Sequence, residues 1–345
     1  MNNTSAIPDW ENKIFQASFY NFDRLALELF QFQYQHNNVY RQYVDSVHIN
    51  PENVNSILKI PFLPIQFFKT NIIKTTEFNA EVIFESSGTT QSVRSHHYIK
   101  SLALYKKCFT QCFNLFYGPE NEWCILALLP SYLERETHLP KGKESSLINM
   151  AGELIKRSGH SLSGFYLQDY EKLYQTILHN EILQQPTLLI GVTYALLDFC
   201  GNYNLNLSNT IIMETGGMKG RRKEITREEV HEILIKRSGV HQIHSEYGMT
   251  EILSQAYSRG SGIFKSPPWM KVLIRNEDDP FSVETTALNT RKPQTGIINI
   301  IDLANIYSCA FIATDDMGKL HHNGSFEVLG RCDYSDIRGC SLLID

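Results

Sequence analysis

The chain has 345 residues, 42% of them apolar, and a formal net charge of -5 at neutral pH. This length can supply one large domain or two closely joined ones, and the negative charge argues against nucleic acid as a main partner. Residues 1–12 are polar and carry acids, unlike a signal or transit peptide, and no apolar run approaches the ~20 residues that cross a bilayer. We therefore expect a cytoplasmic protein without a membrane span.

Seven cysteines in a chain without a secretory signal predict reduced thiols rather than disulfides. Cys108 and Cys112 lie four residues apart, but aromatic residues share their helical face. We interpret the pair as core residues, because no Cys/His spacing in the chain is typical of a zinc site.

The first elements expected are one or two helices over residues 22–47, followed by a proline-punctuated segment at 60–69. Pro61 and Pro64 forbid a regular helix across that segment, which favours an extended, apolar brace. A strand at 82–84 then leads into a loop rich in hydroxyl groups, and a helical pattern begins near Lys100. This order predicts strand, loop, helix.

The loop contains the side chains Ser86, Ser87, Gly88, Thr89 and Thr90. Backbone N–H groups and hydroxyls at the end of a strand can bind phosphate oxygens, whereas an ordinary polar turn is the alternative. Neither G-x-x-x-x-G-K-[ST] nor G-x-G-x-x-G occurs in the chain, so a phosphate loop here would belong to another fold.

Strands then alternate with helices, which indicates parallel sheets with helices on their faces. The expected helices are 100–117, 146–157, 169–179, 194–203 and one that starts with a capping box at Thr226, and the expected strands are 123–129, 164–167, 187–190, 210–213 and 242–244. From Met270 onward only strands are expected, at 271–275, 296–302, 308–313 and 325–329. We therefore predict an α/β fold with an N-terminal helical region at 1–80, an α/β core at 81–265 and a smaller β-rich subdomain at 266–345.

Four further phrases follow the loop in order. They are Glu214-Thr215-Gly216-Gly217-Met218, Tyr247-Gly248-Met249-Thr250-Glu251, Thr314-Asp315-Asp316 and Gly330-Arg331-Cys332-Asp333. The series resembles the acyl-adenylate-forming superfamily of acyl-CoA ligases, peptide-synthetase adenylation domains and firefly luciferase. Within it, residues 129–135, 214–223 and 247–257 are similar to the LuxE-type acyl-protein synthetases, and the resemblance covers nearly the whole chain.

The resemblance implies an adenylate-forming N-terminal-type domain that binds ATP and Mg²⁺. It implies β- and γ-phosphate contacts at Ser86, Ser87, Gly88, Thr89 and Thr90, and adenine contacts at Gly216, Gly217 and Tyr247, with Gly248 among the nucleotide-binding residues. It implies the α-phosphate at Thr250, the metal at Glu251, the ribose at Asp316, and the ribose or a phosphate at Arg331. Tyr247 could instead line the acyl pocket, and Asp315 is an alternative to Asp316. Arg94 would replace a lysine that follows the loop in relatives.

Members of the superfamily usually continue into a further lobe that holds a lysine used in adenylation. This chain stops at Asp345, so we expect that lobe to be absent or nearly so, with Lys219, Arg221 or Arg222 as substitute cations. LuxE-type proteins carry their acyl-accepting thiol near the C-terminus, and the resemblance implies Cys340 here.

The first functional hypothesis is activation of a fatty or aromatic carboxylic acid by ATP and transfer of the acyl group to a protein thiol. The acyl group would then pass to an acceptor protein, such as a reductase or a carrier protein. The second hypothesis is an acyl-CoA or acyl-carrier-protein ligase. The third is a non-catalytic nucleotide-binding scaffold, which an intact Thr250, Glu251 and Asp316 disfavour.

Overall fold

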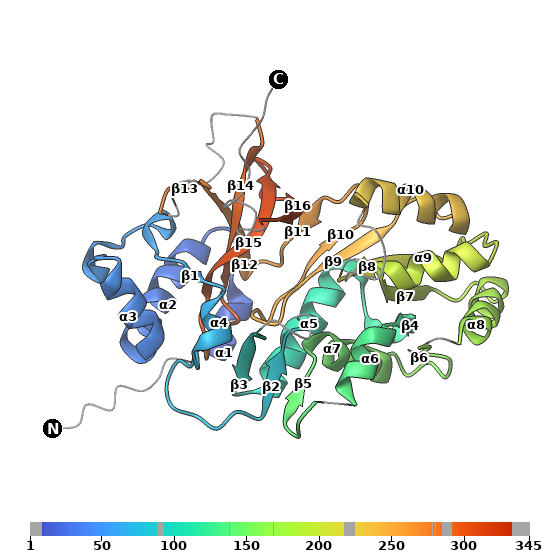
Figure 1. Cartoon of the computed structure of the whole chain (residues 1–345), viewed down its shortest axis with the longest axis horizontal. Helices are drawn as coiled ribbons and strands as arrows, with labels where there is room; N and C mark the ends of the chain where they lie inside the picture. The colour runs from blue at the N-terminus through green and yellow to red at the C-terminus, as the bar shows by residue number, and fades with distance from the viewer. Residues whose placement is uncertain are drawn as a thin grey trace.

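The computed structural model describes residues 9–87, 93–137, 139–167, 169–216, 225–277, 279, 281–284 and 292–332. Figure 1 shows an elongated molecule in which helices flank a long, twisted sheet. The buried apolar side chains of the described residues form one connected cluster that extends through both parts of the sheet. The predicted α/β fold class is confirmed.

One part of the sheet is parallel, and its strands follow the order β9-β8-β7-β4-β6. These strands are β4 (Cys124–Leu128), β6 (Gly164–Phe165), β7 (Thr187–Val192), β8 (Thr210–Thr215) and β9 (His244–Tyr247). The connecting helices are α6 (Pro130–Glu136), α7 (Ser146–Ser158), α8 (Tyr170–Ile182), α9 (Thr193–Asn202) and α10 (Arg227–Ser238), with η4 (Glu120–Glu122) before β4. Every residue of β4 and β7 is buried, as expected for parallel strands covered on both faces.

The other part of the sheet is mostly antiparallel and is hydrogen-bonded to the first through β10 (Ala256–Ser258). Beyond β10 come β11 (Phe264–Lys265), β16 (Phe326–Arg331), β15 (Phe311–Leu320), β14 (Gln294–Asp302), β12 (Met270–Arg275) and β13 (Val283–Glu284). The predicted β-rich segment therefore continues the main sheet, with Phe264 of β11 paired to Phe326 of β16. The domain boundaries stay a prediction.

The N-terminal helices pack against the antiparallel part of the sheet (Figure 1). They are α1 (Trp10–Lys13), η1 (Ile14–Gln16), α2 (Phe22–His36), α3 (Asn38–Ser46), η2 (Pro51–Asn53) and η3 (Ile57–Lys59). The proline-punctuated segment is extended only at β1 (Leu63–Pro64), which pairs in parallel with β15. Its end forms a short helix, α4 (Phe67–Thr70), so the prediction of an extended segment to residue 69 is wrong there.

A second, three-stranded sheet holds the segment before the hydroxyl-rich loop. It consists of β2 (Val82–Glu85), the antiparallel β3 (His96–Ile99) and the parallel β5 (Lys143–Glu144). The predicted order of strand, loop, helix is therefore wrong, because β3 lies between the loop and helix α5 (Leu102–Tyr117). Helix α5 packs on this sheet through the rings of Phe84 and Tyr105, whose centroids are 4.8 Å apart.

Helix α5 also confirms the interpretation of its cysteines. Cys108 and Cys112 are both fully buried, and burial raises the pKa of each thiol.

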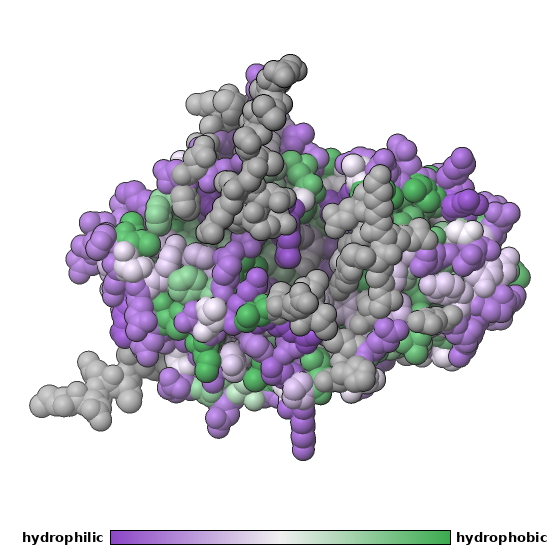
Figure 2. Space-filling view, in the orientation of Figure 1, coloured by the Kyte–Doolittle hydropathy of each residue, from purple (hydrophilic) through white to green (hydrophobic). Residues whose placement is uncertain are grey.

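Within the described ranges, no helix combines the length and apolar character needed to cross a bilayer. On the face shown in Figure 2, hydrophobic residues lie in separate patches among hydrophilic ones.

Candidate active site

The parallel strands bring the second and third sequence motifs to one edge of the sheet. Thr215 ends β8 and Tyr247 ends β9, and a glycine follows each strand. The strand expected at 242–244 lies further along the chain, because β9 begins at His244 and includes Tyr247. Gly216 has a φ of 72°, in the left-handed region that favours glycine. A Cβ atom at Gly248 would collide with the carboxylate of Glu246, so only glycine fits without moving that side chain.

Tyr247 meets the fourth motif through a buried hydrogen bond. Its hydroxyl donates to Asp316 Oδ2 at 2.8 Å, and Arg331 Nε lies 3.1 Å from Asp316 Oδ1. Asp316 and Arg331 are direct partners in the pairing of β15 with β16. Three motifs that are separate in the sequence therefore meet at one carboxylate.

The two consecutive aspartates are distinguished by the strand that contains them. Both lie within β15, where successive side chains point to opposite faces. Asp316 is buried beside Tyr247, whereas Asp315 accepts two hydrogen bonds from Gln66 Nε2, at 2.6 and 2.7 Å. Asp316 is therefore the aspartate that faces the other motif residues.

Glu251 lies in the buried turn that follows Tyr247. Burial raises the pKa of Glu251, Asp316 raises it further, and a hydrogen bond with Ser95 and the charge of Arg331 oppose the shift. A cation bound beside this carboxyl group would lower its pKa and stabilise the ionised form. Thr250, the preceding residue, is half-buried and offers a hydroxyl group next to the carboxylate.

These donors fit a magnesium ion that takes its other ligands from phosphate and water, as Mg²⁺ usually does. A closed metal site of protein ligands alone is a different case. Groups of three or more His, Cys, Asp or Glu side chains arranged to hold a metal do not occur among the residues that the structure describes.

The hydroxyl-rich loop joins this site through Ser95. The Ser86 N–H donates to the Ser95 carbonyl oxygen at 3.1 Å, and the Ser95 N–H donates to Ser86 Oγ at 2.9 Å. The Ser95 side chain also lies near Glu251 and lowers the pKa of that carboxyl group. Two residues further on, His97 Nδ1 donates to the carbonyl oxygen of Thr250 at 2.8 Å. The base of the loop is therefore attached to the turn that holds Glu251.

Ser87 follows Ser86 and is exposed. Arg94 Nη1 lies 2.6 Å from Glu85 Oε1, so Arg94 faces the base of the loop. Other predicted residues lie outside the described residues, namely Gly88, Thr89, Thr90, Gly217, Lys219, Arg221, Arg222 and Cys340.

Supporting residues that sequence reasoning missed hold the turn at Glu251. Asp302 accepts hydrogen bonds from the N–H groups of Leu253 and Ser254, at 2.9 and 3.0 Å. Asn305 Nδ2 donates to the Glu251 carbonyl oxygen at 2.8 Å. These contacts cross about 50 residues of sequence, and no local pattern in the sequence signals them.

A second missed group lies at the end of β8 and β9. Glu246 accepts a hydrogen bond from Thr215 Oγ1 at 2.6 Å, and burial, with nearby Glu214, raises the pKa of Glu246 to about 7. Glu214 itself pairs with Arg227 Nε at 3.2 Å. Glu246 directly precedes Tyr247 in the sequence, and this position next to a predicted motif could have identified it as a site residue.

Comparisons with known proteins give one curated relative and a set of solved structures with a similar fold. No protein-family model matches the chain. A curated relative from Aliivibrio fischeri, a long-chain-fatty-acid–luciferin-component ligase, is 22% identical over an alignment 342 positions long that covers 93% of this chain and 86% of the relative. The chain resembles the LuxE-type ligases over nearly its whole length. The resemblance predicted from the motifs is thereby confirmed.

Solved structures show the fold. The structure of an ATP-bound RpMatB-BxBclM chimera is similar with a TM-score of 0.54 and 16% identity, over 74% of this chain and 50% of the chimera. ATP-bound MatB from Rhodopseudomonas palustris is similar with a TM-score of 0.49 and 15% identity, over 74% of this chain and 50% of that enzyme. The chain thus spans about half the length of the solved structures it matches, and its fold is similar to that part of the chimera.

Proposed function

We propose that this protein is a ligase that activates a fatty acid with ATP as acyl-AMP and transfers the acyl group to a protein thiol. The observation that carries the proposal is the attachment of the loop to the turn of Glu251, through the pairing of Ser86 with Ser95 and the bond from His97 to the Thr250 carbonyl oxygen. This attachment supports the proposal because one Mg²⁺-bound nucleotide needs a phosphate-binding loop and a metal-binding carboxylate side by side. The similarity to a fatty-acid ligase supports the acid as substrate.

In the first step, a carboxylate oxygen of the fatty acid attacks the α-phosphorus of ATP. A new bond joins that oxygen to phosphorus, the bond to the bridging oxygen breaks, and pyrophosphate leaves. Negative charge on the phosphate oxygens increases in the transition state. The site must therefore position the two substrates and neutralise that charge. Mg²⁺, when bound, would neutralise phosphate charge and orient the phosphates.

The residues divide this work by position. Phosphate contacts are proposed for the loop, at Ser86, Ser87, Gly88, Thr89 and Thr90, and for Thr250 at the α-phosphate. Glu251 would hold the metal, and Asp316 would accept the ribose hydroxyls while Tyr247 and Arg331 orient its carboxylate. The adenine ring of ATP would lie against the backbone at Gly216, Gly217 and Gly248.

In the second step, a thiolate attacks the acyl carbon, a thioester forms and AMP leaves with the bonding electrons. Five described cysteines are buried, and only Cys332 among the described cysteines is partly exposed. Cys340 is the proposed acceptor by resemblance, and the acyl group would pass from it to a further protein such as a reductase or a carrier.

The activation step is tested by pyrophosphate exchange with a panel of aliphatic and aromatic acids. We expect exchange that depends on both Mg²⁺ and a fatty acid, with a thermal shift on adding ATP. Ligand at ~100 times its dissociation constant stabilises a fold by ~2.7 kcal/mol, so the shift is measurable. Absence of exchange with every acid and of any ATP-induced shift would contradict the proposal.

The transfer step is tested by labelling the protein with radioactive fatty acid and ATP. Cys340→Ser should keep pyrophosphate exchange but lose the hydroxylamine-sensitive label, whereas the matched control Cys332→Ser should keep both. Label that persists in Cys340→Ser, or disappears in Cys332→Ser, would contradict the acyl-enzyme assignment. Transfer to coenzyme A or to a carrier protein would then be the better account.

A further inference from the structure

A buried carboxylate stands directly before the hydroxyl-rich loop. Glu85 is the last residue of β2, and its side chain is only 5% exposed. Three basic side chains surround it: Arg94 Nη1 lies 2.6 Å from Oε1, while Lys143 Nζ and His96 Nε2 lie 2.7 and 3.2 Å from Oε2. Glu85 is thus the centre of a cluster that we name the Glu85 cluster, made of Glu85, Arg94, His96 and Lys143.

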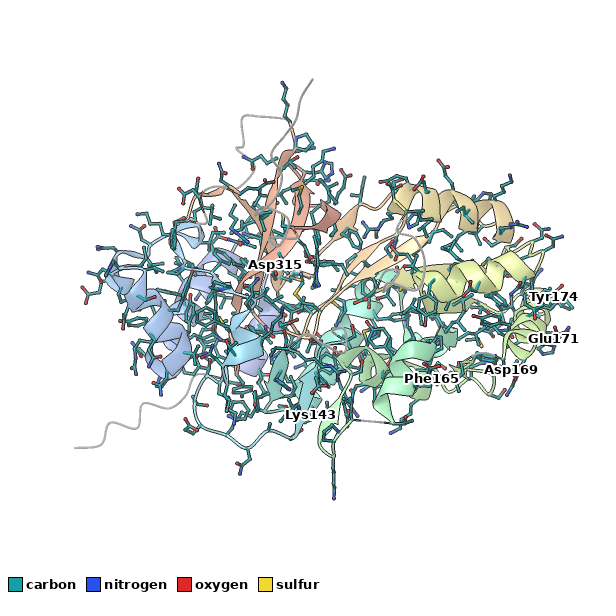
Figure 3. The ribbon with its side chains drawn as sticks, in the orientation of Figure 1. Lys143, Phe165, Asp169, Glu171, Tyr174 and Asp315 are labelled. Atoms are coloured by element: carbon teal, nitrogen blue, oxygen red, sulfur yellow. The ribbon has the colours of Figure 1, made fainter. Side chains whose placement is uncertain are left out.

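The Glu85 cluster joins three separate segments at the base of the loop. Glu85 precedes the loop and Arg94 follows it, so their ion pair holds the two ends together beside the paired Ser86 and Ser95. Lys143 comes from β5, which pairs in parallel with β2. Figure 3 shows Lys143 in the region of β2, β3 and β5.

The charges of the Glu85 cluster do not balance. Burial opposes ionisation of Glu85, but the bonds from Lys143 and Arg94 outweigh it and lower the pKa of Glu85 to about 2. One carboxylate therefore faces two cations, Lys143 and Arg94, whose side chains are 27% and 29% exposed. A net positive charge remains at the base of the loop, within reach of solvent.

The cations also keep donors beyond those that the cluster uses. Lys143 Nζ lies 2.7 Å from Glu85 and 2.8 Å from His96 Nε2, which takes two of the three N–H bonds of an ammonium group. The guanidinium of Arg94 has five donors in a planar fork suited to phosphate. The geometry is that of two oriented cations held by one carboxylate.

We propose that Glu85 is a positioning residue that holds Arg94 and Lys143 as a clamp for the β- and γ-phosphates of ATP, and for free pyrophosphate. This inference rests on the proposed function. A carboxylate that only offset positive charge would weaken phosphate binding, so its removal would tighten it. A carboxylate that orients the two cations is required for binding, and its removal loosens it.

The experiment compares the affinities of AMP, ATP and pyrophosphate by titration calorimetry in the presence of Mg²⁺. Lys143→Gln should weaken ATP and pyrophosphate about 10- to 100-fold, the value of a charge-assisted hydrogen bond, and change AMP by less than about 2-fold. Lys143→Arg should restore most of the lost affinity. Lys141→Gln, the same charge change at an exposed position two residues away, should bind all three ligands like the wild type.

Glu85→Gln should weaken ATP and pyrophosphate in the same way, and thermal unfolding of each variant reports whether the fold is kept. Equal losses for AMP and ATP in Lys143→Gln, or an unchanged pyrophosphate affinity, would overturn the clamp. Tighter pyrophosphate binding by Glu85→Gln would overturn the positioning role. A wild type that binds AMP but no pyrophosphate contradicts the clamp alone, whereas one that binds neither contradicts the proposed function as well.

Discussion

Replacing Tyr247 with phenylalanine removes a single oxygen atom from the centre of the candidate site. That hydroxyl donates to Asp316 Oδ2 at 2.8 Å, and both side chains are buried. The ring keeps its edge contacts with Phe264 and Phe326, whose centroids lie 5.9 and 5.5 Å away. Tyr247→Phe therefore removes the hydrogen bond and leaves the packing in place.

The expected loss follows from comparing the two partners of Asp316. A hydrogen bond to a charged group contributes about 1.5–3 kcal/mol. The ion pair with Arg331 is partly in solvent, since the Arg331 side chain is 73% exposed, and such pairs contribute about 0–1 kcal/mol. Arg331 cannot replace the tyrosine, so we expect Tyr247→Phe to lower the free energy of unfolding by about 2 kcal/mol.

The assay is urea unfolding of the ligand-free protein for Tyr247→Phe, Asp316→Asn and the double variant. The two side chains are in contact, so the double-mutant cycle should give a coupling energy of about 1–2 kcal/mol. Tyr34→Phe is a matched control, because its hydroxyl donates to Asp45 Oδ1 at 2.9 Å on the surface, and it should cost less than about 1 kcal/mol. A coupling energy near zero would refute the reasoning.

Glu251→Gln should lower the turnover of pyrophosphate exchange about 10²-fold, because it removes the carboxylate proposed to hold the metal. Asp316→Asn should mainly weaken ATP binding. If Glu251→Gln turned over like the wild type at saturating ATP, the metal would bind elsewhere. The pKa of Glu85 is lowered from 4.5 to about 2, so its stabilisation is lost as pH falls through that window, and Glu85→Gln should flatten the acid-unfolding curve there. The pKa of Glu246 is raised from 4.5 to about 7, so stability falls as pH rises through that window. Glu246→Gln should therefore raise the Tm at pH 8 but not at pH 4, and an unchanged Tm at pH 8 would contradict the buried setting.

The helices were predictable because their signals are local. Helix α5 begins after Ser101, whose side chain accepts a hydrogen bond from the Leu104 N–H, and α10 has the capping box expected at Thr226. Apolar residues at helical spacing gave the buried face of α2. Each of these signals lies within about four residues of the feature that it predicts.

The partners of the loop were not predictable, because strand pairing depends on residues far apart in the sequence. Residues 96–99 form β3 because they pair with β2, and their alternating burial is visible only once that pairing is known. Lys143 reaches Glu85 across 58 residues. The sequence therefore revealed the loop itself and not the ion cluster that holds its base.

The end of one strand, β15, also differs between the prediction and the structure. The strand expected at 308–313 ends before Thr314-Asp315-Asp316. In the structure β15 continues to Leu320, and Thr314 is satisfied within it by donating to the Ile298 carbonyl oxygen at 2.8 Å. Polar residues of a buried strand find such partners in neighbouring strands, which a local pattern cannot show.

The contact between β3 and the turn of Glu251 does not change its protonation state near neutral pH. His97 lies in β3 and Ser95 directly precedes that strand, so these alternate positions face the turn of Thr250 and Glu251. Burial lowers the pKa of His97 to about 4, against the effect of its bond to Thr250. The imidazole is therefore neutral near pH 7, with the Nδ1 proton held by the carbonyl oxygen. The contact that aligns the loop with Glu251 thus keeps one protonation state throughout the neutral range, while Glu246 titrates beside Tyr247.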